Sequence, residues 1–240
     1  MSNIARFSQE EIAARFPGTQ TREVRNIPVR RYYLIICEGA KTEPNYFKSL
    51  RKKLPTDIVR CIDISGTGTN TLSLLDCAES EYKKREKSQD PPYDKIWLVF
   101  DKDSFPPADF DNTISSAKSR TKPGKCDWDC AWSNEAFELW YLLHFSHHSS
   151  NLSRKQFKDK LETAMKKNLG KTIKYKKNDE NMYSLLEQFQ GAAIAHARKM
   201  LETQEALKIP PSRMNPATRV HLLVEELTRY IEPVSKNISI

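Results

Sequence analysis

Three acidic residues stand where two apolar runs of the chain end, and their spacing suits metal chemistry. Asp101 and Asp103 follow the apolar run 96–100, and Glu38 follows the apolar run 32–37. Extended backbone sends side chains i and i+2 to the same side, so both aspartates can aim at one point. Carboxylates this close repel each other unless one is protonated or a cation lies between them, and their oxygen atoms suit Mg²⁺ or Mn²⁺. The alternative is a polar loop in which Asp101 caps the next helix.

The two apolar runs are typical of strands in a sheet that is covered on both faces. The pattern predicts two further strands, at 58–64 and at 126–132, the second an edge strand with one exposed face. Helices are expected over about 43–54, 71–87, 109–118 and 134–145. This alternation predicts an α/β fold with a mostly parallel four-stranded sheet flanked by helices, in which ligands bind at the carboxyl ends of the strands. If the first and third strands are neighbours, Glu38 and the two aspartates converge there.

The chain divides by pattern into three regions. Residues 1–31 are expected to form a short helix and a basic linker, residues 32–150 the α/β domain, and residues 151–240 a basic helical extension. The helices expected in the extension span 153–168, 179–206 and 216–231. A turn rich in Gly and Thr at 66–70 either offers backbone N–H groups to a phosphate or simply joins a strand to a helix.

The charge of the chain predicts a polyanionic partner. Its 240 residues have a formal net charge of +8 and a pI near 9.1. The segment 152–178 alone carries ten Lys or Arg residues against two acidic residues. Phe157 and Tyr175 lie among these cations, where they can stack on bases or equally face the core. The segment therefore predicts a nucleic-acid-binding surface, and the alternative is a solvated helix face.

Several classes of protein are disfavoured by composition. The mean hydropathy is −0.67, no apolar run approaches the ~18 residues that a membrane span needs, and the N-terminus lacks the apolar core of a signal peptide. The five cysteines show no disulfide-framework spacing, which indicates reduced thiols. A zinc site at Cys126 and Cys130 is disfavoured because a strand with this spacing does not form a ligand knuckle. We therefore expect a cytoplasmic protein that does not associate with a membrane.

Four ordered motifs of the chain resemble those of the RloB family. They are I-C-E-G-x-K-T-E-P-x-Y-F at 36–47, D-x-D-x-F at 101–105, S-N-x-x-F-E-L-W-x-L-L-H-F at 133–145 and N-P-x-T-x-V-H-x-L-V-E at 215–225. The resemblance covers roughly residues 32–228, and it implies a Toprim-type nuclease fold in proteins linked to restriction and phage defence. On the Toprim pattern, Glu38, Asp101 and Asp103 are implied to be catalytic Mg²⁺ ligands for breaking or joining phosphodiester bonds.

The third motif adds a fourth candidate catalytic acid, Glu138. It lies three residues after Glu135, on a helix that Ser133 is expected to cap and whose first turn should lie near the metal. We expect Glu138 to be a further ligand or to support the ligands. The alternative is that Glu135 and Glu138 only offset the helix dipole.

Together these features favour a Mg²⁺- or Mn²⁺-dependent nuclease that acts on DNA or RNA in antiphage defence with a partner ATPase, and an oligomer of identical chains is compatible with the sequence. Six lysines are the expected nucleic-acid contacts: Lys41, Lys102, Lys171, Lys174, Lys176 and Lys177. One alternative is a non-catalytic sensor or adaptor subunit that binds nucleic acid. Another is a phosphatase of the haloacid-dehalogenase type with Asp101 as nucleophile, although there the aspartate follows the first strand and here it follows the third.

Overall fold

The computed structural model describes residues 31–66, 71–103, 105–170 and 173–231. A five-stranded sheet with the strand order β2-β1-β3-β4-β5 forms its centre. The strands are β1 (Tyr33–Cys37), β2 (Ile62–Gly66), β3 (Lys95–Asp101), β4 (Asp127–Asn134) and β5 (Ala217–Thr218). The first four are parallel and β5 is antiparallel to β4. The expected α/β class and mostly parallel sheet are confirmed, but the expected number of four strands is wrong.

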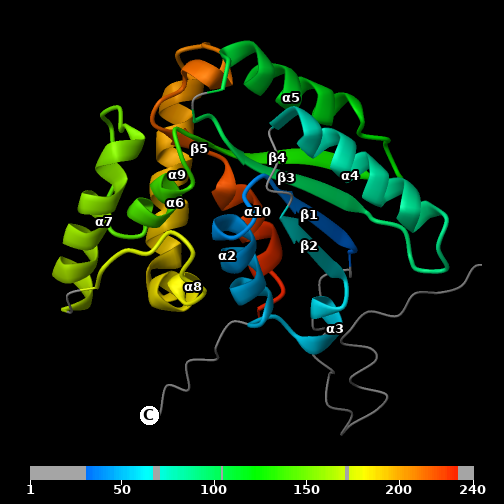
Figure 1. The fold of residues 1–240 in the computed structure, drawn as a ribbon, viewed down its shortest axis with the longest axis horizontal. Helices are drawn as coiled ribbons and strands as arrows, with labels where there is room; N and C mark the ends of the chain where they lie inside the picture. The colour runs from blue at the N-terminus through cyan, green and yellow to red at the C-terminus, as the bar shows by residue number, and fades with distance from the viewer. Residues whose placement is uncertain (1–30, 67–70, 104, 171–172, 232–240) are drawn as a thin grey trace, which may run out of the picture.

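Helices cover both faces of this sheet (Figure 1). The helices α4 (Thr71–Glu86) and α5 (Pro107–Ser119) lie on one face, and α2 (Thr42–Arg51) and α10 (Val220–Thr228) lie on the other. The remaining α-helices are α3 (Thr56–Val59), α6 (Glu138–Leu143), α7 (Arg154–Leu169), α8 (Met182–Leu186) and α9 (Gln190–Glu205). Short 3-10 helices span Glu187–Phe189 and Pro211–Arg213.

Two hydrophobic clusters form the core, one on each face of the sheet. Alternate residues of β1 belong to different clusters: Tyr33 and Ile35 pack with α2 and α10, whereas Leu34 and Ile36 pack with α4 and α5. Because both faces are covered, all five residues of β1 are buried. The first cluster also contains Leu161 of α7, so residues on both sides of position 150 share one core. The division into domains at that position stays a prediction.

Several element boundaries differ from those expected. Residues 56–59 form α3, so the second strand begins at Ile62 rather than at residue 58. The helix expected over 179–206 is divided into α8, a 3-10 turn and α9. The helix expected from 216 begins at Val220, because the preceding residues pair with β4 as β5.

The strand β4 and the helix after it show the largest difference. We expected a strand that ends at residue 132 and a helix capped by Ser133, but β4 continues through Asn134 and α6 begins only at Glu138. Ser133 and Asn134 pair with β5, and the hydroxyl groups of Ser133 and Thr218 lie 3.0 Å apart. The expected edge strand is therefore paired on both sides at its carboxyl end.

Some expectations concern parts of the chain outside the described residues. The short N-terminal helix and nearly all of the basic linker lie there, as does most of the Gly- and Thr-rich turn at 66–70. Within the described part of the chain, no helix has the length and apolar character that crossing a membrane requires.

Candidate active site

The carboxyl ends of β1 and β3 lie side by side and bring Glu38 to Asp101. The two strands pair in parallel, with Cys37 opposite Val99. The backbone N–H of Glu38 donates to the Val99 carbonyl at 2.9 Å, and the backbone N–H of Asp101 donates to Glu38 Oε2 at 3.2 Å. The expectation that the first and third strands are neighbours is therefore confirmed.

A cavity of about 430 Å³ opens at this edge of the sheet. Its acidic lining residues are Glu38, Glu43, Asp101 and Asp103, and its basic lining residues are Lys41, Arg154 and Lys177. The remaining lining residues are Gly39, Ala40, Thr42 and Asn178. A volume of this size accommodates a small ligand or one nucleotide unit of a longer chain. The cavity thus brings together the three predicted metal ligands and two of the six predicted lysines.

Glu43 is a site residue that the sequence reasoning missed. It lies in the first turn of α2, and its side chain is buried. The absence of a side chain at Gly39 makes room for it, because a Cβ atom there would overlap the Glu43 carboxylate. The signal that could have found it is an acid in the first turn of a helix that directly follows a buried strand and a glycine turn.

Burial and mutual repulsion shape the electrostatics of these acids. Burial, and then the charges of Glu43 and Asp103, raise the pKa of Glu38 to about 7. The pKa of Asp101 is raised well above its usual value by burial and by the charges of Glu43 and Glu138. Burial and the charge of Glu138 likewise raise the pKa of Glu43. Ionising the whole cluster therefore needs a compensating positive charge.

Two buried oxygen atoms of this cluster have no hydrogen-bond donor among the described residues. They are Asp101 Oδ1 and Glu43 Oε2. A buried carboxylate oxygen without a donor is costly unless the acid is protonated or a cation binds it. Oxygen atoms of this kind are the ligands that Mg²⁺ and Mn²⁺ prefer, so the donor set fits a hard divalent cation.

The acids nevertheless do not form a ready-made coordination shell. No group of three or more His, Cys, Asp or Glu side chains in the described part of the chain is arranged so that it could hold a metal ion. One reason is visible at Asp103, whose carboxylate accepts a hydrogen bond from Arg154 Nη1 in an ion pair. Asp103 has a φ of 38°, in a left-handed region that aspartate tolerates better than most residues. A cation bound between these acids would therefore compete with Arg154 for the Asp103 carboxylate.

Glu138 is not among the residues that line the cavity. It is buried at the start of α6, and its Oε1 accepts a hydrogen bond of 2.9 Å from the Tyr175 hydroxyl. Its charge raises the pKa of Asp101 and of Glu43, so it belongs to the same electrostatic cluster. Glu135 instead binds the start of α7: its carboxylate accepts a hydrogen bond of 2.7 Å from the backbone N–H of Arg154.

The six predicted lysines lie in different environments. Lys41 and Lys177 are exposed and line the cavity. Lys102 points elsewhere, because its Nζ donates to the Phe105 carbonyl at 2.5 Å. Lys174 and Lys176 are exposed but do not line the cavity. Lys171 lies outside the described residues.

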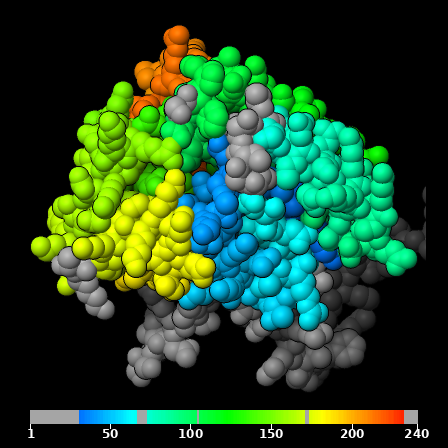
Figure 2. Space-filling model, in the orientation of Figure 1, coloured from blue at the N-terminus to red at the C-terminus, as the bar shows by residue number. Residues whose placement is uncertain are grey.

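The segment 173–178 carries Lys177 to the cavity. The Thr42 hydroxyl donates to the Lys177 carbonyl at 2.9 Å, and Asn45 Nδ2 donates to the Asn178 carbonyl at 3.1 Å. Figure 2 shows this part of the chain (yellow) lying directly against α2 (blue). Lys41 occupies the N-cap position of α2, and the Thr42 side chain binds this segment rather than the helix.

A second cavity of about 380 Å³ lies between the end of α6 and α7. It is lined by Lys160, Lys167 and His148 together with apolar and neutral polar residues, and Asp159 is its one acidic lining residue. It therefore lacks the paired carboxylates on which metal chemistry at the first cavity would depend.

Comparison with known proteins identifies one family. The family model described as RloB-like protein matches residues 33–227, a range that includes every lining residue of the first cavity. No curated protein and no solved structure matches the chain.

Proposed function

The chain belongs to the RloB-like family, and on that premise we propose that it is a Mg²⁺- or Mn²⁺-dependent nuclease of the Toprim type. The observation that carries the proposal is the pair of buried carboxylate oxygens without donors, on Asp101 and Glu43, beside Glu38 where β1 and β3 end. Such a cluster is costly to ionise in a folded protein unless a cation binds it, and acids with raised pKa values that line a cavity are candidates for function. The open α/β sheet supports the same assignment, because ligands of such sheets bind at the carboxyl ends of their strands.

In this proposal Glu38, Asp101 and Asp103 hold the divalent ion, and Glu43 and Glu138 add negative charge around them. When bound, the ion polarises a phosphodiester and offsets the charge that develops on its oxygen atoms. Arg154, Lys41 and Lys177 line the same cavity and bind the phosphate backbone by charge, which gives affinity without choice of sequence. Gly39 allows the Glu43 carboxylate to occupy this position, because a Cβ atom there would overlap it.

The test is cleavage of labelled single- and double-stranded DNA and RNA with Mg²⁺ or Mn²⁺. We expect Asp101→Asn and Glu38→Gln each to reduce cleavage by at least about 100-fold, the scale on which loss of one charge-stabilising group acts in active sites. Asp76→Asn is the control, because Asp76 is an exposed acid of α4 that does not line the cavity. Unchanged cleavage in both site variants would remove these residues from the active site.

A second candidate function is a non-catalytic adaptor that binds nucleic acid. The observation that favours it is that the described acids do not form a preformed group of three metal ligands. An adaptor would bind DNA or RNA tightly, with an affinity that falls steeply as salt concentration rises, but would cleave none of them with either metal. The cleavage assay above, run beside a binding assay at two salt concentrations, separates the two functions.

The setting of this activity is also part of the proposal. The resemblance to restriction-linked proteins supports a role in antiphage defence, in the cytoplasm, with a partner ATPase. Co-purification of the tagged protein from its native locus, with and without phage infection, tests whether an ATPase accompanies it. The same preparation, measured by light scattering, tests whether the chain forms an oligomer.

A further inference from the structure

Arg154 is fixed to the cavity at two points. It is the first residue of α7, where its backbone N–H donates to the Glu135 carboxylate at 2.7 Å. Its side chain reaches Asp103, where Nη1 donates to Oδ2. The sequence reasoning counted Arg154 only as one cation of the basic segment. The tertiary structure places it in the same cavity as the acids that the proposed function needs.

The Arg154–Asp103 ion pair is weak enough to exchange. The Arg154 side chain is 43% exposed and that of Asp103 is 29% exposed, and ion pairs in contact with water contribute little net stability. A guanidinium group has five N–H donors in a planar fork. The bond to Asp103 uses one nitrogen, so donors remain for a second anion.

Arg154 also competes with a metal ion for the Asp103 carboxylate. Arg154 pairs with Asp103 Oδ2, and a divalent cation bound to the same carboxylate would withdraw its negative charge from the guanidinium group and repel that group. The charge of Arg154 meanwhile lowers the pKa of Glu38 and of Glu43, against the effect of burial, so the guanidinium group stabilises their ionised forms. Arg154 therefore supplies part of the positive charge that a bound cation would otherwise supply.

We propose that Arg154 is an internal counter-cation that a divalent metal ion displaces from Asp103, and that the released guanidinium group then binds the phosphate of the substrate. The proposal rests on the proposed nuclease function and adds a role that the predicted metal ligands do not have. This role is consistent with acids that line one cavity without forming a coordination shell, because Asp103 is paired with Arg154 when no metal ion is bound.

The test uses Arg154→Gln with Lys155→Gln as its matched control. Each substitution removes one exposed positive charge from the first turn of α7, but Lys155 does not line the cavity. Binding of Mn²⁺ to the full chain without nucleic acid is measured by electron paramagnetic resonance of the free ion. Binding of inorganic phosphate at saturating Mg²⁺ is measured by ³¹P NMR titration, and thermal unfolding confirms that both variants are folded.

We expect Arg154→Gln to bind Mn²⁺ about threefold to fivefold more tightly than the control, the size of one exposed ion pair. Its affinity for inorganic phosphate should fall about tenfold, because a charge-assisted bidentate contact is lost. Equal or weaker Mn²⁺ binding than in the control overturns the proposal while leaving the metal site intact. Tighter Mn²⁺ binding with unchanged phosphate affinity overturns the phosphate role. If neither the wild-type protein nor the variant binds Mn²⁺, the inference and the proposed function fail together.

Discussion

At the scale of single residues, the chain keeps acids buried where they reduce stability. Glu38, Glu43 and Asp101 all have raised pKa values, chiefly because burial disfavours their charged forms. An ionisable residue that lowers the stability of the fold and lies in a cavity is a candidate functional residue. The cost should be measurable in the metal-free protein.

Glu38→Gln is therefore expected to stabilise the metal-free protein at high pH. The folded-state pKa of Glu38, about 7, is above its ordinary value of 4.5, so between these pH values the folded protein holds a proton that the unfolded chain releases. The contribution of Glu38 to the free energy of unfolding thus falls as pH rises through this window. After discounting for partial exposure, we expect the variant to be about 1 kcal/mol more stable than wild type at pH 8, with a smaller gain at pH 5.

Urea unfolding at the two pH values checks this expectation. Asp76→Asn serves as the control, since Asp76 is exposed on α4 and no pH-dependent gain is expected there. Excess Mg²⁺ should reduce the advantage of the Gln variant, because the wild-type protein gains stability from the ion it binds. A variant that is less stable than wild type at pH 8, or a gain that does not change with pH, would contradict the assignment of a raised pKa to Glu38.

At the scale of elements, the site depends on the close approach of β2 to the turn between β1 and α2. A Cβ atom at Gly66, the last residue of β2, would lie 2.6 Å from the Gly39 carbonyl oxygen and 2.7 Å from Pro44 Cγ. It would also lie 3.1 Å from Ala40 Cα. These atoms belong to backbone or to a proline ring, so no flexible side chain can move aside. The glycine therefore allows the turn that carries Glu38, and the start of α2 that carries Glu43, to pack on β2.

Gly66→Ala should destabilise the protein by about 1–3 kcal/mol, the range expected for an overpacked contact. Gly191→Ala, in α9, is the matched control, because a Cβ atom there meets nothing within 4 Å. At an unstrained helical position this second change should stabilise by about 0.4–1 kcal/mol. Thermal unfolding of both variants decides the matter, and a Gly66→Ala protein as stable as wild type would show that the turn has room to move.

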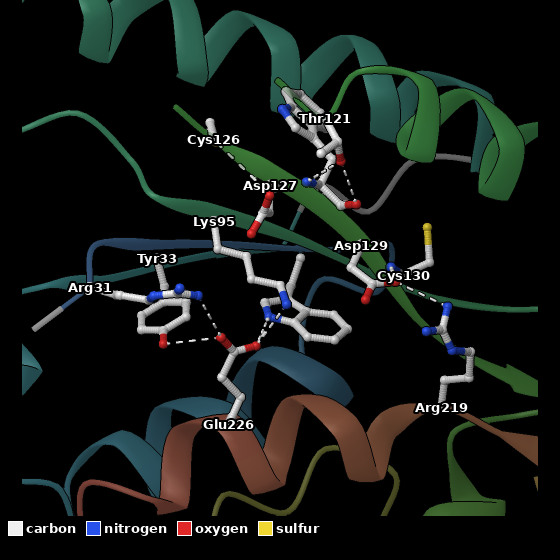
Figure 3. Close-up of polar contacts among 12 residues, drawn as sticks. Arg31, Tyr33, Lys95, Thr121, Cys126, Asp127, Asp129, Cys130, Arg219 and Glu226 are labelled. Atoms are coloured by element: carbon white, nitrogen blue, oxygen red, sulfur yellow. Dashed lines mark hydrogen bonds and ion pairs between the residues drawn. The ribbon is translucent and has the colours of Figure 1, made fainter. Parts of the chain in front are cut away.

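At the scale of the whole molecule, Glu226 joins the last helix to the first and third strands (Figure 3). This buried acid of α10 accepts hydrogen bonds from the Tyr33 hydroxyl at 3.3 Å and from Trp97 Nε1 at 3.1 Å. Lys95 Nζ lies 3.0 Å from its carboxylate and Arg31 Nη1 lies 3.7 Å from it. Tyr33 and Lys95 begin their strands, so the network ties the chain together at the edge of the sheet opposite the cavity.

Glu226→Gln is expected to reduce the free energy of unfolding by about 2–4 kcal/mol, because the largely buried ammonium group of Lys95 would lose its ionised partner. Glu225→Gln is the control on the same helix, since Glu225 pairs with Arg198 at the surface and should cost less than about 1 kcal/mol. Urea unfolding measures both. Cleavage below the unfolding transition should be unchanged in the Glu226 variant, and a selective loss of cleavage would indicate a link from this network to the site.

The local pattern of the sequence determined the parts of the fold that depend on local burial. The unbroken apolar runs before Glu38 and Asp101 predicted β1 and β3, because a strand covered on both faces needs apolar side chains at successive positions. The D-x-D spacing predicted that both aspartates belong to one site, and both line the cavity. Parallel neighbours then place Glu38 beside them.

Only the tertiary structure decided the features that depend on contacts between distant segments. The extension of β4 through Asn134 depends on pairing with β5, whose Thr218 is 85 residues from Ser133. The choice of Lys177 over Lys102 as a cavity residue depends on the contact of the 173–178 segment with α2. Arg154 lies 51 residues after Asp103 in the chain, and the packing of α7 brings the two side chains together. Residue spacing and local propensity do not predict these three contacts. Each contact depends on how two elements that are far apart in the sequence pack against one another.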